Sequence, residues 1–458
     1  MVGMAAMWAA GRWRRRVPAR LRAMPTSRSP GAEGHENHPL TYLDTPEAVD
    51  HYLASIAGVR ELAMDTEGAS FHRFVDRIYL LQLSTRDESA IIDPLPIGTP
   101  AGLGRLLEDP DVAVVFHDAD YDLRLLHQDY GWHVRNVFDT RIAAQLLGMR
   151  AFGLAALMEH FFGVKIDKKH QRADWSLRPL TQGMLDYAAQ DTRRLLELRD
   201  RLHAELVRLG RLSWAEEEFA RLEGLRWEPV QEGTGFLKMK GARDLNRREL
   251  ALLRELVQWR DSVAGQLDRA TFRVVGNETL FELARTAPRT REALGAVKGM
   301  PRGIVERSSA DVLAAIERAL ALPDAELPRF PRAPRWDRDP DFDERVTRLK
   351  AVRDAAAHRL SLDPGVLFSR DRLEAVARKN PASVAELAEM PEIRRWQVAE
   401  LGEALVKALA GSGAAAPTSA TPVAAADGAA AATPATPAPR KSAASAAARN
   451  GNDSPYKD

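Results

Sequence analysis

The sequence predicts an α/β domain, a mixed sheet with flanking helices, followed by two all-α modules. Over residues 40–210, short apolar runs separated by turn or polar residues give way to helical patterns, which indicates strands covered by helices. From about residue 246 the strand signals nearly vanish, and the chain repeats itself at an offset of 93 residues. A Pro-rich segment separates the two copies.

The apolar runs of the first domain supply the expected strands. They are Leu62–Met64, Ile78–Leu83, Ala90–Ile92 and Val112–Phe116. An amphipathic helix is expected after the last run, and residues 180–209 predict one long helix. Strands first and then β–α alternation favour a mixed sheet.

The repeat in the second half predicts two copies of one small helical module. At the constant offset, Arg260-Asp261 matches Arg353-Asp354 and Pro288 matches Pro381. We therefore expect a first domain at 39–210, a connector at 211–245, modules at 246–322 and 343–410, and between the modules a stiff Pro-rich linker at 323–342.

Both ends of the chain predict disorder. Residues 1–38 hold seven Arg and two Glu, which favours a basic arm, with a transit peptide or a true start at Met24 as alternatives. Residues 411–458 hold 18 Ala and six Pro with almost no large apolar side chains, so they cannot bury enough surface to offset their ordering entropy.

Composition excludes several classes of protein. Cysteine is absent, which removes disulfide partners and thiolate metal sites and fits a reducing cytoplasm. We find no apolar run long enough to span a membrane. The net charge of +1 is a cancellation, because residues 39–245 carry 25 basic and 33 acidic groups (net −8), whereas the two modules carry +3 and +1. Overall neutrality therefore does not exclude a nucleic-acid partner.

Four acids and one tyrosine of the first domain stand out by their context. Asp65 and Glu67 end an apolar strand on one face, where two carboxylates are costly unless solvated or neutralised by a cation. Asp122 follows the Val112–Phe116 run in the first turn of the next helix, where complementing the helix dipole is the simpler interpretation. Tyr187 and Asp191 share a helix face, and taken alone they could be a core tyrosine beside a surface acid.

Taken together, these five side chains fit one chemistry. Mg²⁺ and Mn²⁺ prefer oxygen ligands, and a substrate phosphate can complete their coordination. Two such ions about 4 Å apart stabilise the attacking and the leaving oxygen of a phosphoryl displacement. A nearby tyrosine hydroxyl can orient or deprotonate the attacking water.

The order Asp-x-Glu, His-x4-Asp and Tyr-x3-Asp resembles the three motifs of the DEDD 3′→5′ exonucleases, in the subgroup with a tyrosine. The surrounding sequence resembles the ribonuclease D family at Asp65-Thr66-Glu67, Leu81-Gln82-Leu83, Ile92-Asp93-Pro94-Leu95, Asp139-Thr140 and Asp174-Trp175-Ser176-Leu177-Arg178-Pro179-Leu180. The helical repeats are similar to HRDC modules, although Val352 replaces the tryptophan that the first repeat has at Trp259. The resemblance covers about residues 40–410.

This resemblance implies a ribonuclease H-like fold with a five-stranded mixed sheet and two HRDC modules that bind RNA. It implies a metal-dependent 3′→5′ exoribonuclease that releases nucleoside 5′-monophosphates and trims precursor tRNA and other small RNAs. Asp65, Glu67, Asp122 and Asp191 would hold two Mg²⁺ or Mn²⁺ ions, and Tyr187 would position the water. We further expect a monomer in the cytoplasm. A DNA exonuclease and a non-catalytic RNA-binding protein are the alternatives.

A basic stretch before Trp175 is a candidate substrate contact. Lys168, Lys169, Gln171 and Arg172 could grip phosphate while Trp175 stacks a base. A packed tryptophan anchoring a loop with solvated lysines explains the same pattern. Asp139 precedes an amphipathic turn and is expected to cap that helix.

Overall fold

The structure is a computed structural model, and it describes residues 38–229, 233–331 and 340–411. The basic arm and the Ala/Pro-rich tail lie outside the described residues, apart from a residue at the inner edge of each, and so does part of the Pro-rich linker. Among the helices that are described, none combines the length and the apolar character that crossing a membrane requires.

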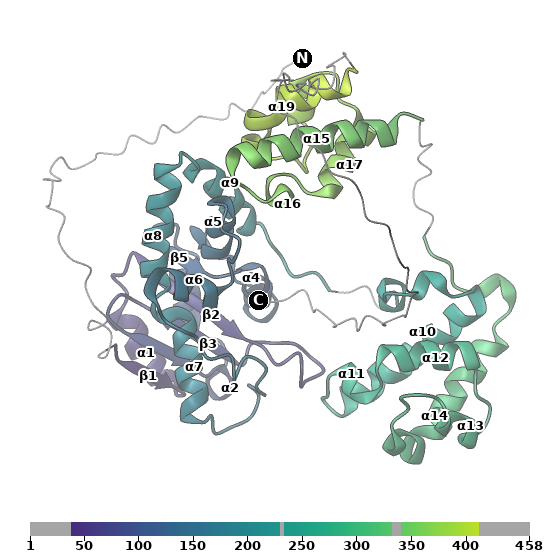
Figure 1. The fold of residues 1–458 in the computed structure, drawn as a ribbon. Coiled ribbons are helices and arrows are strands. Elements are labelled where there is room, and N and C mark those ends of the chain that lie inside the picture. The colour runs from purple at the N-terminus through teal and green to yellow at the C-terminus, as the bar shows by residue number, and fades with distance from the viewer. Residues whose placement is uncertain (1–37, 230–232, 332–339, 412–458) are drawn as a thin grey trace, which may run out of the picture. The chain divides into compact units, whose positions relative to one another are not determined.

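A six-stranded mixed sheet forms the centre of the first domain (Figure 1). Its spatial order is β1-β4-β3-β2-β5-β6, in which β2 pairs antiparallel with β3 and parallel with β5. The strands are β1 (Leu40–Leu43), β2 (Glu61–Glu67), β3 (Leu80–Ser84), β4 (Ser89–Ile92), β5 (Ala113–Phe116) and β6 (Val137–Asp139). The expected sheet of five strands is therefore one strand short, and the two outermost strands, β1 and β6, had not been predicted from the apolar runs.

Nine helices accompany this sheet in the described part of residues 38–229. They are α1 (Pro46–Ser55), α2 (Pro94–Ile97), α3 (Ala101–Leu107), α4 (Asp120–Tyr130), α5 (Thr140–Leu146), α6 (Leu154–Phe162), α7 (Gln182–Arg193), α8 (Leu195–Arg208) and α9 (Leu212–Leu222). The single helix expected over 180–209 is wrong, because the chain leaves helical geometry at Arg194 (φ −110°, ψ 8°) and forms α7 and α8 instead. Helix α9 lies in the segment expected to be a connector.

The two faces of β2 carry different contacts because side chains alternate along a strand. Leu62 and Met64 belong to a buried cluster that also holds residues of α1, α3 and α4. Ala63, on the other face, belongs to the cluster that contains the leucines of α8. Asp65 and Glu67 continue the face of Ala63, so they point to the side that α7 and α8 cover (Figure 1).

The second half of the chain confirms the helical repeat. The first copy contains α10 (Arg247–Gln266), α11 (Thr271–Val274), α12 (Asn277–Thr286), α13 (Arg291–Gly295) and α14 (Arg302–Ala321), and the second contains α15 (Phe342–Leu360), α16 (Pro364–Leu367), α17 (Arg370–Lys379), α18 (Val384–Ala388) and α19 (Arg395–Leu409). Helices α16, α17, α18 and α19 each begin 93 residues after their counterparts. Short 3₁₀ turns lie at Gly235–Lys238, Ala242–Asp244 and Asp324–Glu326.

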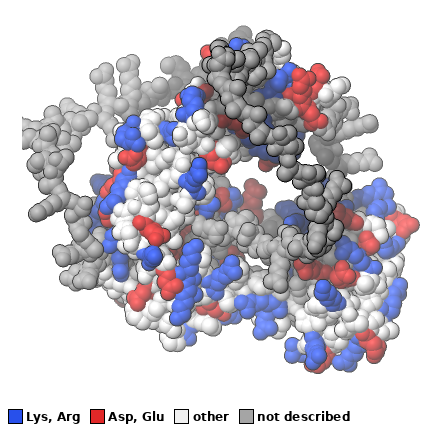
Figure 2. All heavy atoms as spheres, viewed as in Figure 1, with Lys and Arg blue, Asp and Glu red and all other residues white. Residues whose placement is uncertain are grey.

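Local signals are repeated with the helices. Thr290 caps α13 and Ser383 caps α18 through the same kind of side-chain bond to a backbone N–H. Ala287 and Asn380 end α12 and α17 in the left-handed region. Basic and acidic side chains are interspersed over the face of the molecule seen in Figure 2, in keeping with the near-zero net charge.

Candidate active site

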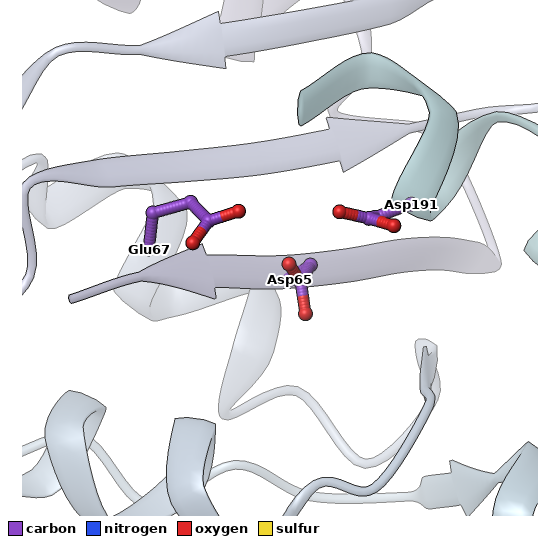
Figure 3. A group of neighbouring side chains, drawn as sticks. All are labelled: Asp65, Glu67 and Asp191. Atoms are coloured by element: carbon purple, nitrogen blue, oxygen red, sulfur yellow. The ribbon is translucent and has the colours of Figure 1, made fainter. Parts of the chain in front are cut away.

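Three of the predicted acids meet at one place. Oxygen atoms of Asp65, Glu67 and Asp191 all lie within 4.8 Å of one another. Asp65 and Glu67 lie at the C-terminal end of β2, and Asp191 reaches them from α7 (Figure 3). Asp65 and Glu67 point the same way because residues two apart share a strand face. Asp191 reaches them because α7 packs on that face of β2.

The donor set suits a hard divalent cation. Three carboxylates packed this closely repel one another unless a positive charge lies between them. Carboxylate oxygens are the ligands that Mg²⁺ and Mn²⁺ prefer, and no thiolate competes because the chain has no cysteine. Asp65, Glu67 and Asp191 are therefore the residues that fit a metal here.

The acids open into a pocket that also receives Tyr187. Asp65, Glu67 and Asp191 line it together with Tyr187, and Lys168 and Gln171 from the loop before α7 contribute further polar groups. Tyr187 lies on α7 one turn before Asp191, so the same helix face presents both side chains, as the spacing predicted.

Asp122 makes a different contact. It is fully buried in the first turn of α4, and its Oδ1 accepts hydrogen bonds from the backbone N–H of Thr66 at 3.0 Å and from the Thr66 hydroxyl at 2.6 Å. Thr66 stands between Asp65 and Glu67 on the opposite face of β2. In this structure Asp122 thus holds the strand that carries the two acids and is not part of the three-carboxylate group, and its role as a metal ligand stays a prediction.

The predicted substrate residues separate into groups. Lys168 and Gln171 line the acidic pocket, whereas Lys169 and Arg172 are exposed and are not among its lining residues. Trp175 is only 1% exposed and packs in a cluster with Tyr79, Leu80 and other residues. Base stacking by Trp175 is therefore contradicted by the structure, because the indole is buried against the sheet and α7.

The pocket also contains side chains that motif spacing had not singled out. His117 and Asp118 line it because β5 runs parallel to β2, so the carboxyl ends of both strands meet at one edge. Their signal lay in the His-x4-Asp motif, of which only Asp122 had been assigned to the site, whereas Asp118 had been taken as a possible helix cap. The apolar lining residues had no sequence signal: Leu154, Ala155, Ile166 and Leu195.

A hydrogen-bond chain orients the His117 ring. The Thr140 hydroxyl donates to the carbonyl of Phe116 at 3.0 Å and lies 2.9 Å from Nδ1 of His117. Because a hydroxyl has one proton, Nδ1 of His117 is the donor in the second bond. This assigns the proton of a neutral ring to Nδ1.

Asp139 fixes the turns around this edge of the sheet. Its carboxylate caps α5 through the backbone N–H groups of Arg141 and Ile142, which confirms the predicted cap, and also accepts from those of Asp118 and Ala119. Burial raises the pKa of Asp139, while these backbone donors oppose the rise. Asp118 caps no helix; its side chain pairs with Arg141 at 2.7 Å.

Comparison with known protein families identifies the class of each part of the chain. Residues 40–207 match the family model described as 3'-5' exonuclease, and residues 249–316 and 342–409 match the HRDC domain. The chain is 35% identical to ribonuclease D of Granulibacter bethesdensis over 71% of this chain and 83% of the relative, and 32% identical to that of Gluconacetobacter diazotrophicus over 75% and 86%. The chain belongs to the ribonuclease D family.

Solved structures agree with this assignment. The crystal structure of Escherichia coli RNase D, described as an exoribonuclease involved in structured RNA processing, covers 81% of this chain and 98% of its own at 26% identity, with a TM-score of 0.63. The catalytic core of RRP6 from Trypanosoma brucei covers 62% and 81% at 31% identity, with a TM-score of 0.56. The expectation of a 3′→5′ exoribonuclease is confirmed, and neither a DNA exonuclease nor a non-catalytic protein is favoured.

Proposed function

We propose that the chain shortens RNA from its 3′ end in a reaction that needs two Mg²⁺ or Mn²⁺ ions and releases nucleoside 5′-monophosphates. The observation that carries this proposal is the convergence of Asp65, Glu67 and Asp191 in a pocket that Tyr187 also lines. When bound, the ions would neutralise the charge on the scissile phosphate and lower the pKa of a bound water.

The side chains of the pocket have separate tasks in this proposal. Tyr187 holds the attacking water through its hydroxyl, from the helix that also carries Asp191. Lys168 and Gln171 contact the phosphate and sugar of the terminal nucleotides, since they line the same pocket. Asp122 keeps β2 in place through Thr66 and completes the ligand set.

The experiment is a shortening assay with end-labelled RNA. The chain is incubated with a 3′-tailed tRNA precursor or the matched DNA, in Mg²⁺ or in EDTA. Ladder-wise shortening of the RNA that EDTA abolishes supports the proposal. RNA binding without shortening contradicts it, and faster shortening of DNA than RNA contradicts the substrate class.

Variants make the assignment specific to residues. Asp191→Asn and Asp122→Asn are both expected to abolish shortening while the chain stays folded. Asp186→Asn is the matched control, because Asp186 is an exposed acid on the same helix that accepts a 3.0 Å hydrogen bond from the side-chain amide of Gln182. A control as inactive as Asp191→Asn would show that the assay responds to helix damage and not to the site.

Precursor tRNA and other small RNAs with 3′ extensions are the proposed substrates, and a cytoplasmic monomer is the proposed form. Competition between a tRNA precursor and an unstructured RNA of equal length tests the first, since equal rates would contradict it. Light scattering after size exclusion tests whether the chain is a monomer, and cell fractionation tests whether it is cytoplasmic. A dimer mass or a membrane-associated chain would overturn them.

A further inference from the structure

The loop between α6 and α7 brings substrate-facing residues to the pocket without any helix or strand of its own. Residues 163–181 contain Lys168 and Gln171, which line the pocket, and the buried Trp175. A connection of this length holds one conformation only where side-chain contacts fix it. The contacts that fix this loop therefore bear on the geometry of the site.

One of these contacts is an ion pair between Arg178 and Asp93. The guanidinium donates from Nε and Nη2 to the two carboxylate oxygens, the second bond at 2.8 Å, and Asp93 is only 2% exposed. Tyr42 adds a hydroxyl bond to the same carboxylate at 2.5 Å. Burial raises the pKa of Asp93, but the bonds from Arg178 and Tyr42 outweigh burial and the pKa is lowered, so the pair is charged.

The same guanidinium holds the backbone on both sides. Its Nη1 donates to the carbonyls of Trp175 and Leu177, each at 2.7 Å, and its Nη2 donates to the carbonyl of Tyr79 at 2.9 Å. Tyr79 precedes β3, and Asp93 follows β4. One arginine thus ties the loop to two strands of the sheet.

What the loop presents to α7 is a pair of rings around Tyr187. The Trp175 ring centroid lies 6.1 Å from that of Tyr187 with an interplanar angle of 31°, and the His170 ring lies 6.1 Å away at 62°. Both rings belong to the loop that Arg178 anchors. The orientation of the Tyr187 ring, and hence the place of its hydroxyl, therefore depends on where this loop is held.

We propose that the Asp93–Arg178 pair is a positioning element for Tyr187, acting through the carbonyl and the ring of Trp175. The pair also explains two conspicuous sequence motifs, Ile92-Asp93-Pro94-Leu95 and Asp174–Leu180, which the pocket itself does not use. The proposal rests on the proposed function, because it assumes that the Tyr187 hydroxyl holds the attacking water.

Arg178→Gln removes the charge and the two-point contact with Asp93. Displacement of a supporting group typically lowers activity about tenfold to a hundredfold. We expect a fall of that size in kcat, with KM changed by less than about threefold, because the acids remain in place. In a Tyr187→Phe background the same substitution should lower kcat by less than about twofold, since the hydroxyl that it misplaces is already gone.

Arg199→Gln is the matched control. Arg199 also forms an ion pair with a carboxylate of the first domain, that of Glu61, and its side chain is similarly shielded, 19% exposed against 24% for Arg178. Glu61 begins β2, at the end of the strand away from Glu67. This variant should lose stability and leave kcat within about twofold of the unsubstituted chain.

A spectroscopic readout keeps the inference testable without catalysis. The tryptophans are replaced with 5-fluorotryptophan, and the ¹⁹F resonance of Trp175 is assigned from its loss in Trp175→Phe. Arg178→Gln should shift or broaden this resonance, and Arg199→Gln should leave it in place. If the unsubstituted chain shortens no RNA, the proposed function fails, while the resonance still reports whether Arg178 holds Trp175.

Two results would overturn the inference. One is a Trp175 resonance that is the same in Arg178→Gln and in the unsubstituted chain. The other is an equal fall in kcat with and without the Tyr187 hydroxyl, which would mean that Arg178 supports the fold or another group and not the tyrosine.

Discussion

Thr66→Val removes one hydroxyl from the strand residue between Asp65 and Glu67. The hydroxyl donates to Asp122 at 2.6 Å, and both side chains are buried, Thr66 being 1% exposed. Valine has nearly the shape of threonine, so the substitution leaves little cavity, and the backbone N–H of Thr66 still donates to the carboxylate. The lost bond is therefore the main effect.

The magnitude follows from the acceptor. A hydrogen bond to a charged group contributes about 1.5–3 kcal/mol, whereas one between neutral groups contributes about 1 kcal/mol. We expect Thr66→Val to lower the free energy of opening β2 by about 2 kcal/mol, which is roughly a 30-fold change in the opening equilibrium. Native-state hydrogen exchange of the β2 amides measures this locally, which suits a chain with several domains.

Thr192→Val provides the comparison. The Thr192 hydroxyl is equally buried but bonds a neutral group, Ser84, at 2.8 Å, and Ser84 keeps a second partner in Ser89. Its loss should lower the opening free energy of neighbouring amides by about 1 kcal/mol or less. The reasoning is refuted if Thr66→Val costs less than Thr192→Val, or less than about 0.5 kcal/mol.

Four further outcomes follow from the structure. Asp191→Asn should weaken Mn²⁺ binding at least tenfold by calorimetry or electron paramagnetic resonance, because it removes one of three clustered carboxylates. Tyr187→Phe should lower kcat about 10²- to 10⁴-fold in single-turnover assays with little change in RNA affinity, and a loss of affinity alone would contradict its role. Trp175→Ala should lower the free energy of unfolding by about 3–5 kcal/mol in urea melts, since the indole is buried. The lowered pKa of Asp93 contributes stability that is present above the unfolded pKa of about 3.9 and is lost as the pH falls through the folded pKa. Asp93→Asn should therefore lower the free energy of unfolding most near pH 7 and less toward pH 3. An equal loss at both pH values would show that the negative charge of Asp93 does not stabilise the fold.

Local periodicity could place Asp65 beside Glu67 and Tyr187 beside Asp191, because residues two apart on a strand and four apart on a helix share a face. Assigning them to one site also needed the combination of the three motifs and their resemblance to a known family. Sequence could not show that Asp122 bonds Thr66, since that contact joins residues 56 apart and depends on how α4 docks. Nor could it decide between stacking and packing for Trp175. The indole is buried by packing against residues such as Tyr79, Leu80 and Ile91, which lie far from it along the chain.

The edges of the fold were missed for a related reason. Strands β1 and β6 have four and three residues and lack the continuous apolar run that indicated the equally short β4 and β5. The break between α7 and α8 occurs at Arg194 in a stretch without glycine or proline, so the sequence contains no helix-breaking residue that would have predicted it. The repeat was predictable because matching residues, among them Arg260-Asp261 and Pro288, recur at one offset along the chain.

The central claim is that Asp65, Glu67 and Asp191 direct divalent ions to the phosphate at the RNA 3′ end. Single-turnover hydrolysis of an RNA with sulfur replacing a non-bridging oxygen at its 3′-terminal phosphodiester tests it most directly. Sulfur is a soft ligand that Mg²⁺ binds poorly and Mn²⁺ binds better. We predict that one sulfur stereoisomer is hydrolysed much more slowly than the all-oxygen RNA in Mg²⁺ and recovers in Mn²⁺. Equal slowing in both metals, or none in either, would contradict metal contact with the scissile phosphate.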